Sequence, residues 1–200
     1  MKIKTVEYVG TIATPNQKRP GPLPQIAFSG RSNVGKSSLI NVVLKRNRKA
    51  IARVSSTPGK TQAINFFEVN GEFYLVDLPG FGYAQVPKKL RDAWRGLIEG
   101  YLSSEEGPIG VVHLVDCRRP PTELDLQMLD YLSGVGLPTL VVLTKMDKLK
   151  SQRAREVAID TAAKDLGIDR DQLVPFSSLS GEGRDALAGA LGGLLRGAGG

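Results

Sequence analysis

Short apolar runs alternate with amphipathic stretches along this chain, and that order predicts an α/β fold. Seven runs predict strands, at residues 6–9, 25–29, 63–69, 72–76, 109–115, 139–143 and 174–176. Helices are predicted at about 36–44, 90–101, 122–132, 151–166 and 182–195. We expect three layers: a mostly parallel six-stranded sheet with one antiparallel strand, covered by helices on both faces, with the run at 6–9 as a separate short strand.

Two patterns indicate how the strands run. Asn70-Gly71 separates two of the apolar runs, and this dipeptide is a strong hairpin signal because both residues tolerate positive φ. The strands on either side should therefore be antiparallel. The run at 109–115 is apolar almost throughout, which is typical of a strand buried on both faces, and His113 within it is expected to be a core histidine.

One domain accounts for most of the chain. Residues 14–24 contain four prolines and two basic residues, which predicts an irregular arm. We expect residues 1–24 to form a strand and arm packed on the domain, 25–196 to form the domain itself, and 197–200 to be a flexible tail.

The composition is that of a globular protein with a basic excess. The chain has 200 residues, of which 41% are hydrophobic, and 27 basic against 20 acidic side chains give a net charge of +7. Its single cysteine, Cys117, excludes an internal disulfide, and no signal peptide or membrane-spanning run is visible. We expect a cytoplasmic protein with no membrane partner.

The clearest chemical signal is a glycine-bounded loop between the strand at 25–29 and the following helix. Residues 30–37, GRSNVGKS, match G-x-x-x-x-G-K-[ST] completely, so this is a P-loop. Its backbone N–H groups can turn inward onto phosphate oxygens, and the helix N-terminus adds positive potential. Lys36 should reach the β- and γ-phosphates, while Ser37 should coordinate Mg²⁺. The predicted phosphate-binding residues are Gly30, Arg31, Ser32, Asn33, Val34, Gly35, Lys36, Ser37 and Ser38.

A second segment, residues 77–80, carries the pattern D-x-x-G at the end of a predicted strand. Asp77 can hold the Mg²⁺ shell, and the Gly80 N–H can contact a γ-phosphate. Leu78 and Pro79 complete the segment. Phe81 stands where many GTPases place a glutamine that orients the attacking water. Its ring can neither donate nor accept the hydrogen bonds needed for this, so we expect slow intrinsic hydrolysis of a bound nucleoside triphosphate.

Two further segments indicate a guanine base. Asp147 ends the run Thr144-Lys145-Met146-Asp147, and its carboxylate can accept hydrogen bonds from N1–H and the 2-amino group of guanine. Adenine would leave that carboxylate unpaired. The Lys145 stem would cover the base, while Thr144 departs from the usual N-K-x-D and offers fewer bonds than asparagine. Backbone N–H groups at Phe176, Ser177 and Ser178 are candidates for guanine O6.

In this order the motifs resemble the translation-factor-related P-loop GTPases, and more narrowly the EngB (YihA/YsxC) family of ribosome-assembly GTPases. The resemblance covers about residues 5–195 and includes a threonine in the base motif, which is usual for that family. The segments that carry it are IAFSGRSNVGKSSLIN at 26–41, STPGKTQ at 56–62, INFF at 64–67, DLPGFGYA at 77–84 and TKMDKL at 144–149.

The resemblance implies a GTP-binding and GTP-hydrolysing switch that acts in late assembly of the large ribosomal subunit and is needed for normal cell division and septation. It implies that Thr61 joins Ser37 on Mg²⁺, and that Lys36, Thr61 and Gly80 take part in catalysis. It adds Gly59, Lys60, Thr61, Gln62 and Ala63 as residues that close over the nucleotide.

Two basic clusters flank the predicted switch segments and favour contact with RNA. Together with the resemblance, they indicate a large-subunit precursor or ribosomal RNA as the partner, no DNA partner, and a monomer. The first cluster is Lys45, Arg46, Arg48, Lys49, Arg53 and Lys60, and the second is Lys88, Lys89, Arg91 and Arg95.

Two other functions stay open on the sequence alone. One is a nucleotide-dependent scaffold for RNA or protein with negligible hydrolysis, which Phe81 allows. The other is a P-loop kinase, which would leave the segment from Thr144 to Asp147 without a role.

The P-loop also generates a prediction about monovalent ions. An asparagine at the position of Asn33 can ligate K⁺ beside the β- and γ-phosphates, where the cation would replace an arginine finger. Under this hypothesis GTP turnover is faster in KCl than in NaCl at equal ionic strength. Equal rates in the two salts would reject it and leave Asn33 as a loop residue.

Overall fold

The computed structural model describes residues 3–14, 17–44, 63–82 and 88–197, with the side chains of 88–91 excepted. The whole of the first basic cluster, together with Gly59, Thr61 and Gln62, therefore lies outside the described residues, and so do the side chains of Lys88, Lys89 and Arg91 in the second cluster. Within the described part of the chain, no helix combines the length and apolar character needed to cross a membrane.

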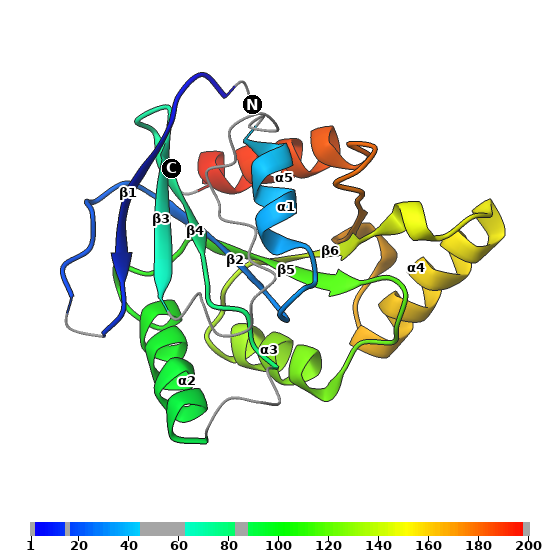
Figure 1. Cartoon of the computed structure of the whole chain (residues 1–200), viewed down its shortest axis with the longest axis horizontal. Helices are drawn as coiled ribbons and strands as arrows, with labels where there is room; N and C mark the ends of the chain where they lie inside the picture. The colour runs from blue at the N-terminus through cyan, green and yellow to red at the C-terminus, as the bar shows by residue number, and fades with distance from the viewer. Residues whose placement is uncertain (1–2, 15–16, 45–62, 83–87, 198–200) are drawn as a thin grey trace.

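The strands and helices alternate as the sequence predicts (Figure 1). The strands are β1 (Val6–Ile12), β2 (Gln25–Gly30), β3 (Ile64–Val69), β4 (Phe73–Asp77), β5 (Gly110–Asp116), β6 (Thr139–Thr144) and β7 (Leu173–Pro175). The helices are α1 (Lys36–Val43), α2 (Lys88–Leu102), α3 (Glu123–Gly134), α4 (Gln152–Leu166) and α5 (Arg184–Gly197).

The strands form one seven-stranded sheet in the order β1-β3-β4-β2-β5-β6-β7. The predicted hairpin is confirmed: β3 and β4 are antiparallel, and Asn70 and Gly71 have φ values of 58° and 68° in the turn between them. The sheet has seven strands rather than six, because β1 pairs antiparallel with β3 and extends the edge. Since β3 alone runs against the other strands, the predicted single antiparallel strand is correct.

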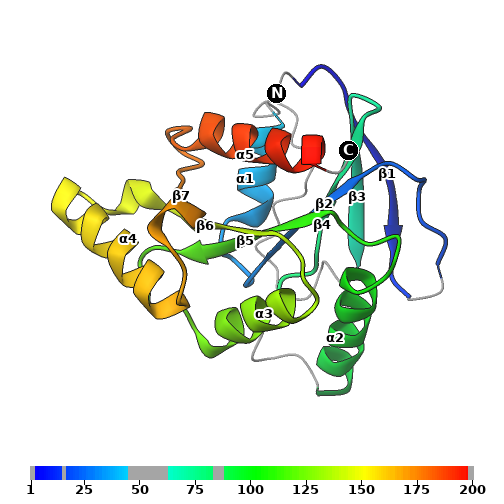
Figure 2. The ribbon, with the colours of Figure 1, turned by 180° about the vertical axis from the view of Figure 1, so that it is seen from behind.

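Helices cover both faces of the sheet, as expected for buried parallel strands (Figures 1 and 2). On one face, α1 and α5 pack over Phe28, Val112 and Leu114. On the other face, α2 and α3 pack over Ala27 and Val111, and α4 covers the far end near β6 and β7.

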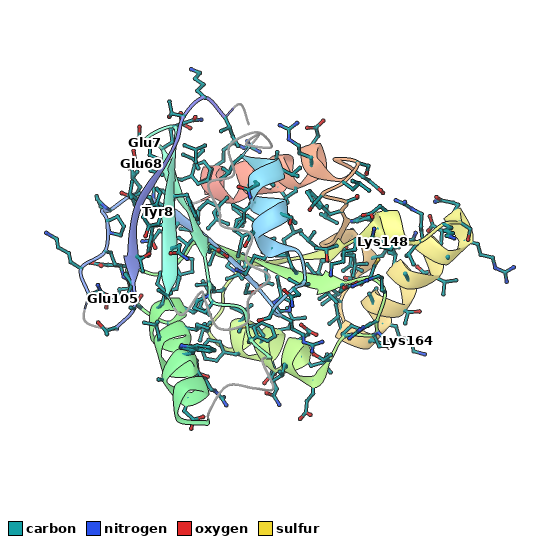
Figure 3. The ribbon with its side chains drawn as sticks, in the orientation of Figure 1. Glu7, Tyr8, Glu68, Glu105, Lys148 and Lys164 are labelled. Carbon is teal, nitrogen blue, oxygen red and sulfur yellow. The ribbon has the colours of Figure 1, made fainter. Side chains whose placement is uncertain are left out.

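The two edges of the sheet differ in what they carry (Figure 3). At one edge, Glu7 and Glu68 are register partners on β1 and β3, far from the predicted nucleotide motifs. Lys148 lies toward the other side, beside α4. The carboxyl ends of β2, β4, β5, β6 and β7 lead into the loops that carry those motifs, which is where ligands bind in open α/β sheets.

Candidate functional site

The P-loop connects the end of β2 to the first turn of α1. Gly35 caps α1 with a φ of 106°, a left-handed conformation that favours glycine. Asn33 also has a positive φ, of 64°. Val34 is buried beneath the loop. The loop therefore has the backbone reversal of a phosphate-binding turn, and the Val34 N–H donates within it to the carbonyl of Arg31 over 3.2 Å.

The structure brings Lys36 of the P-loop against Asp77 of the D-x-x-G segment. The ammonium of Lys36 is paired with Oδ1 of Asp77, and both side chains are buried. A buried ion pair is costly to separate unless another charged group replaces one partner. A phosphate for Lys36 and a hydrated divalent cation for Asp77 are such replacements.

The D-x-x-G segment lies directly on the P-loop. The Ser32 N–H donates a hydrogen bond to the carbonyl of Phe81 over 3.0 Å, and the Phe81 N–H points at the carbonyl of Gly30 at 3.4 Å. Gly80 fits because it has no side chain: a Cβ there would lie 2.9 Å from Oγ of Ser32. Any larger residue at position 80 would separate the two segments.

The base motif is tied to the P-loop from the other side. The hydroxyl of Thr144 donates to the carbonyl of Val34 over 2.7 Å. The ammonium of Lys145 donates to the carbonyl of Asn33 over 2.6 Å and to Oδ2 of Asp116 over 2.8 Å. The segment that would bind the base and the loop that would bind phosphate therefore form one connected structure.

Asp147 lies at the start of the turn after β6 and faces the segment that follows β7. The Ser177 hydroxyl donates to its Oδ1 over 2.8 Å, and Lys148 lies 3.2 Å from its Oδ2. The hydrogen bond from Ser177 is the main cause that lowers the pKa of Asp147. The carboxylate is therefore ionised at neutral pH and able to accept from N–H donors.

One expectation about the base site needs correction. The N–H of Phe176 donates to the carbonyl of Leu143, and the N–H of Ser177 donates to the carbonyl of Glu182. Both groups are used within the protein. Of the three residues proposed for guanine O6, Ser178 is the one whose N–H has no backbone acceptor among the residues that the structure describes.

Sequence reasoning missed Asp116, the last residue of β5. Its carboxylate receives Lys145 and also a two-pronged contact from Arg118, at 2.9 Å and 2.7 Å. Burial raises the pKa of Asp116, but these hydrogen bonds outweigh it and hold the pKa well below its usual range. The available signal was an acidic residue at the end of a buried strand beside the base-motif strand.

The described site also contains a cavity of about 480 Å³ between the D-x-x-G segment, α2 and α3. Phe81 contributes to its wall, together with Trp94, Leu124, Met128 and Tyr131. The Phe81 ring is stacked on the buried His113, with ring centres 6.0 Å apart and planes 11° apart. That stacking directs the ring into the protein.

Comparison with known proteins agrees with this geometry. Residues 25–145 match the family model described as 50S ribosome-binding GTPase. A probable GTP-binding protein EngB from Gemmatimonas aurantiaca is 53% identical over 196 residues, covering 98% of this chain and 95% of the relative. A second, from Geobacter metallireducens, is 50% identical over 188 residues, covering 94% of this chain and 90% of the relative. The chain belongs to the EngB family of GTPases.

Solved structures support the same assignment. A crystal structure of a probable EngB GTP-binding protein superimposes with a TM-score of 0.70 at 25% identity, over 86% of this chain and 98% of the other. Era in complex with MgGDPNP and a 16S ribosomal RNA segment shares the fold, with a TM-score of 0.64 at 21% identity over 85% of this chain and 56% of that one. The resemblance and the GTPase activity inferred from the EngB motifs are thus confirmed.

The Asp116 contacts generate a prediction about this EngB protein's stability and its pH dependence. Asp116→Asn removes the charge that faces Lys145 and Arg118, so we expect the free energy of unfolding at pH 7 to fall by about 1–3 kcal/mol. The pKa of Asp116 is lower in the folded protein than in the unfolded chain, where it is near 4. Its carboxylate therefore stabilises the fold fully above about pH 4, and this stabilisation decreases as the pH falls from there through the folded pKa. Urea titrations of both proteins at neutral pH and near pH 3 should show a smaller difference in acid; a constant difference would contradict the assignment.

Proposed function

We propose that this protein is a GTP-driven switch in late assembly of the large ribosomal subunit, and that cells need it for normal division and septation. Its membership of a GTPase family described by 50S ribosome binding supports this role. The observation that carries the nucleotide half is the bridge from the base motif to the P-loop through Lys145. This hydrogen bond connects the segment that carries Asp147, the proposed base-binding carboxylate, to the proposed phosphate-binding loop.

In this proposal the P-loop residues from Gly30 to Ser38 bind the phosphates. Lys36 exchanges Asp77 for the β- and γ-phosphates, and the backbone N–H groups around Gly35 supply further donors. Ala63 and the segment before it close over the nucleotide. Gly80 meets the γ-phosphate through its N–H.

The base site is built around Asp147. Its ionised carboxylate accepts from guanine N1–H and the 2-amino group, and the Ser178 N–H is the remaining donor for O6. The Lys145 stem covers one face of the base. Adenine offers neither donor to Asp147, so an adenine nucleotide gains no hydrogen bond from this carboxylate.

The oxygen ligands present fit Mg²⁺. A serine hydroxyl at Ser37 and a buried carboxylate at Asp77 are hard donors, and Mg²⁺ takes the rest of its shell from water and phosphate oxygens. We propose that Ser37 and Thr61 are the direct ligands and that Asp77 holds the hydrated shell. The bound ion would neutralise charge on the phosphates, and K⁺ at Asn33 would add to that effect.

Hydrolysis by the isolated protein should be slow. Phe81 has no group that can orient a water molecule, and its ring is packed on His113. Lys36 and the loop N–H groups are left to stabilise developing phosphoryl charge. A ribosomal partner would supply the missing group that orients the attacking water. Because Phe81 lacks such a group, a scaffold with negligible GTP hydrolysis is the second candidate function.

We further propose ribosomal RNA as the contact, with no DNA or membrane partner, for a monomer in the cytoplasm. The net charge of +7 supports an RNA partner. Of the second basic cluster, Arg95 is described, and it is exposed and paired with Glu99 over 2.6 Å. The division into an arm at 1–24, a GTPase domain at 25–196 and a tail at 197–200 completes this proposal.

Guanine selectivity is tested with Asp147→Asn. An amide in place of the carboxylate sets an N–H against the guanine donors, so we expect GTP affinity to fall by about two orders of magnitude or more. Competition of GTP and ATP for binding, compared between the variant and wild type, measures this. Asp165→Asn, an exposed change on α4, is the matched control. Unchanged guanine preference in Asp147→Asn would overturn the proposed base site.

The ribosomal role is tested by co-sedimentation with large-subunit precursors in GTP, GDP or a non-hydrolysable GTP analogue. We expect binding with the triphosphates and release with GDP. Single-turnover hydrolysis measured with and without the particles separates the two candidate functions, because a switch is accelerated and a scaffold is not. Binding that ignores the nucleotide would remove the switch.

A further inference from the structure

His113 occupies an unusual place for a core histidine. It lies in the middle of β5 with none of its surface exposed. The Ser29 hydroxyl, one residue before the P-loop, lies 2.8 Å from its Nδ1. On its other side, Nε2 lies 3.5 Å from Oδ1 of the buried Asp125 near the start of α3. The ring thus connects the base of the P-loop to the start of a neighbouring helix.

The carboxylate that faces His113 is held in a charged form. Burial raises the pKa of Asp125, but His113 and the N–H and hydroxyl of Thr122 together lower it. Both Thr122 groups contact Oδ2, at 2.8 Å and 2.6 Å, so Oδ1 is left for the ring. With Nε2 protonated toward Asp125, Nδ1 is the acceptor for the Ser29 hydroxyl.

The third contact of His113 is with the loop that would meet the γ-phosphate. Its ring is stacked on Phe81, one residue after Gly80. The Phe81 carbonyl in turn accepts from the Ser32 N–H of the P-loop. Phe81 also borders the 480 Å³ cavity, so a change of loop position has space available on that side.

The polar atoms at this junction are incompletely satisfied. Among the residues that the structure describes, four buried side-chain polar atoms have no hydrogen-bond partner: Nε of Arg31, Oγ of Ser32, Nε2 of His113 and Oδ1 of Asp125. All four lie where the P-loop, the D-x-x-G segment, β5 and α3 meet. Two of these atoms, Nε2 of His113 and Oδ1 of Asp125, face each other at 3.5 Å, so the ring and the carboxylate are close without meeting the geometry of a hydrogen bond.

We propose that His113 is a positioning residue for GTP hydrolysis: by stacking on Phe81 while bridging Ser29 and Asp125, it sets where Gly80 lies against the P-loop. This inference rests on the proposed function, because it takes Gly80 as the contact to the γ-phosphate. His113 itself touches neither nucleotide nor water in the reaction. Its effect is transmitted through the ring of Phe81.

The test compares His113→Leu with His113→Gln. Leucine keeps apolar volume but has no polar group for Asp125 or Ser29, whereas the glutamine amide can donate to Asp125 and its planar group can still pack on the Phe81 ring. We expect His113→Leu to slow single-turnover GTP hydrolysis by about 10- to 100-fold, because small misplacements of reacting groups have effects of that size. GDP affinity should stay within about twofold of wild type, and affinity for a non-hydrolysable GTP analogue should fall. His113→Gln should recover most of both losses.

Trp94 supplies a readout that does not depend on turnover. It is the sole tryptophan of the chain and lines the same cavity as Phe81. Exchange of GDP for the GTP analogue should change its fluorescence in wild type and in His113→Gln, and should change it less in His113→Leu. Asp125→Asn is a second variant, which keeps an oxygen as acceptor for Thr122. Like His113→Leu, it should slow GTP hydrolysis, lower the affinity for the GTP analogue and reduce the change in Trp94 fluorescence.

Val111→Ala is the matched control, since Val111 lies two residues away on the same face of β5 and outside this junction. It should lower stability and leave hydrolysis and the GTP-to-GDP affinity ratio unchanged. Wild-type behaviour of His113→Leu, or an equal loss in Val111→Ala or His113→Gln, would overturn the positioning role. If wild type itself fails to prefer guanine nucleotides, the proposed function fails instead.

Discussion

The Lys145 ammonium is the contact on which the candidate site most depends. It joins the carbonyl of Asn33 in the P-loop to the carboxylate of Asp116 at the end of β5. Lys145, the residue that follows β6, thereby ties the loop predicted to bind phosphate to the turn predicted to bind the base. Because the pKa of Asp116 is held well below its usual range, its carboxylate stays ionised at neutral pH and can accept this bond as a charge-assisted one.

The rest of the site is organised by strands that end at one edge of the sheet. β2 delivers the P-loop, β4 delivers Asp77, and β6 delivers the base motif. Parallel pairing sets the spacing between these ends, so loops far apart in sequence become neighbours without contacts of their own. The loops then need local bonds, such as Ser32 to Phe81, only for their final positions.

The sequence predicted most of the fold because its strongest patterns are local. The Asn70-Gly71 turn, the run at 109–115 and the P-loop each determine structure within a few residues of themselves. β1 was not assigned to the sheet, since its exposed and half-buried positions carry little periodicity and its partner is nearly sixty residues away.

The parts of the site that escaped prediction depend on contacts between distant segments. Asp116 belongs to no short motif, and its role appears only when β5 and β6 are seen side by side. The internal acceptors for the Phe176 and Ser177 N–H groups were equally invisible, because they come from the end of β6 and from a turn beyond the segment. Motifs identify groups that can bind a ligand, and tertiary structure decides which of those groups are already occupied.

Thr144 has one hydroxyl hydrogen and two carbonyl oxygens within reach, Val34 at 2.7 Å and Val115 at 3.1 Å. An asparagine would bring two N–H hydrogens to the same place, whereas the threonine must divide one between them. The strand and the loop therefore compete for a single proton, and strengthening either bond weakens the other. If the P-loop moves slightly and the bond to Val34 weakens, the Thr144 hydroxyl can bond more strongly to Val115 in β5. The P-loop can therefore shift at a lower energetic cost than if an asparagine held both carbonyls.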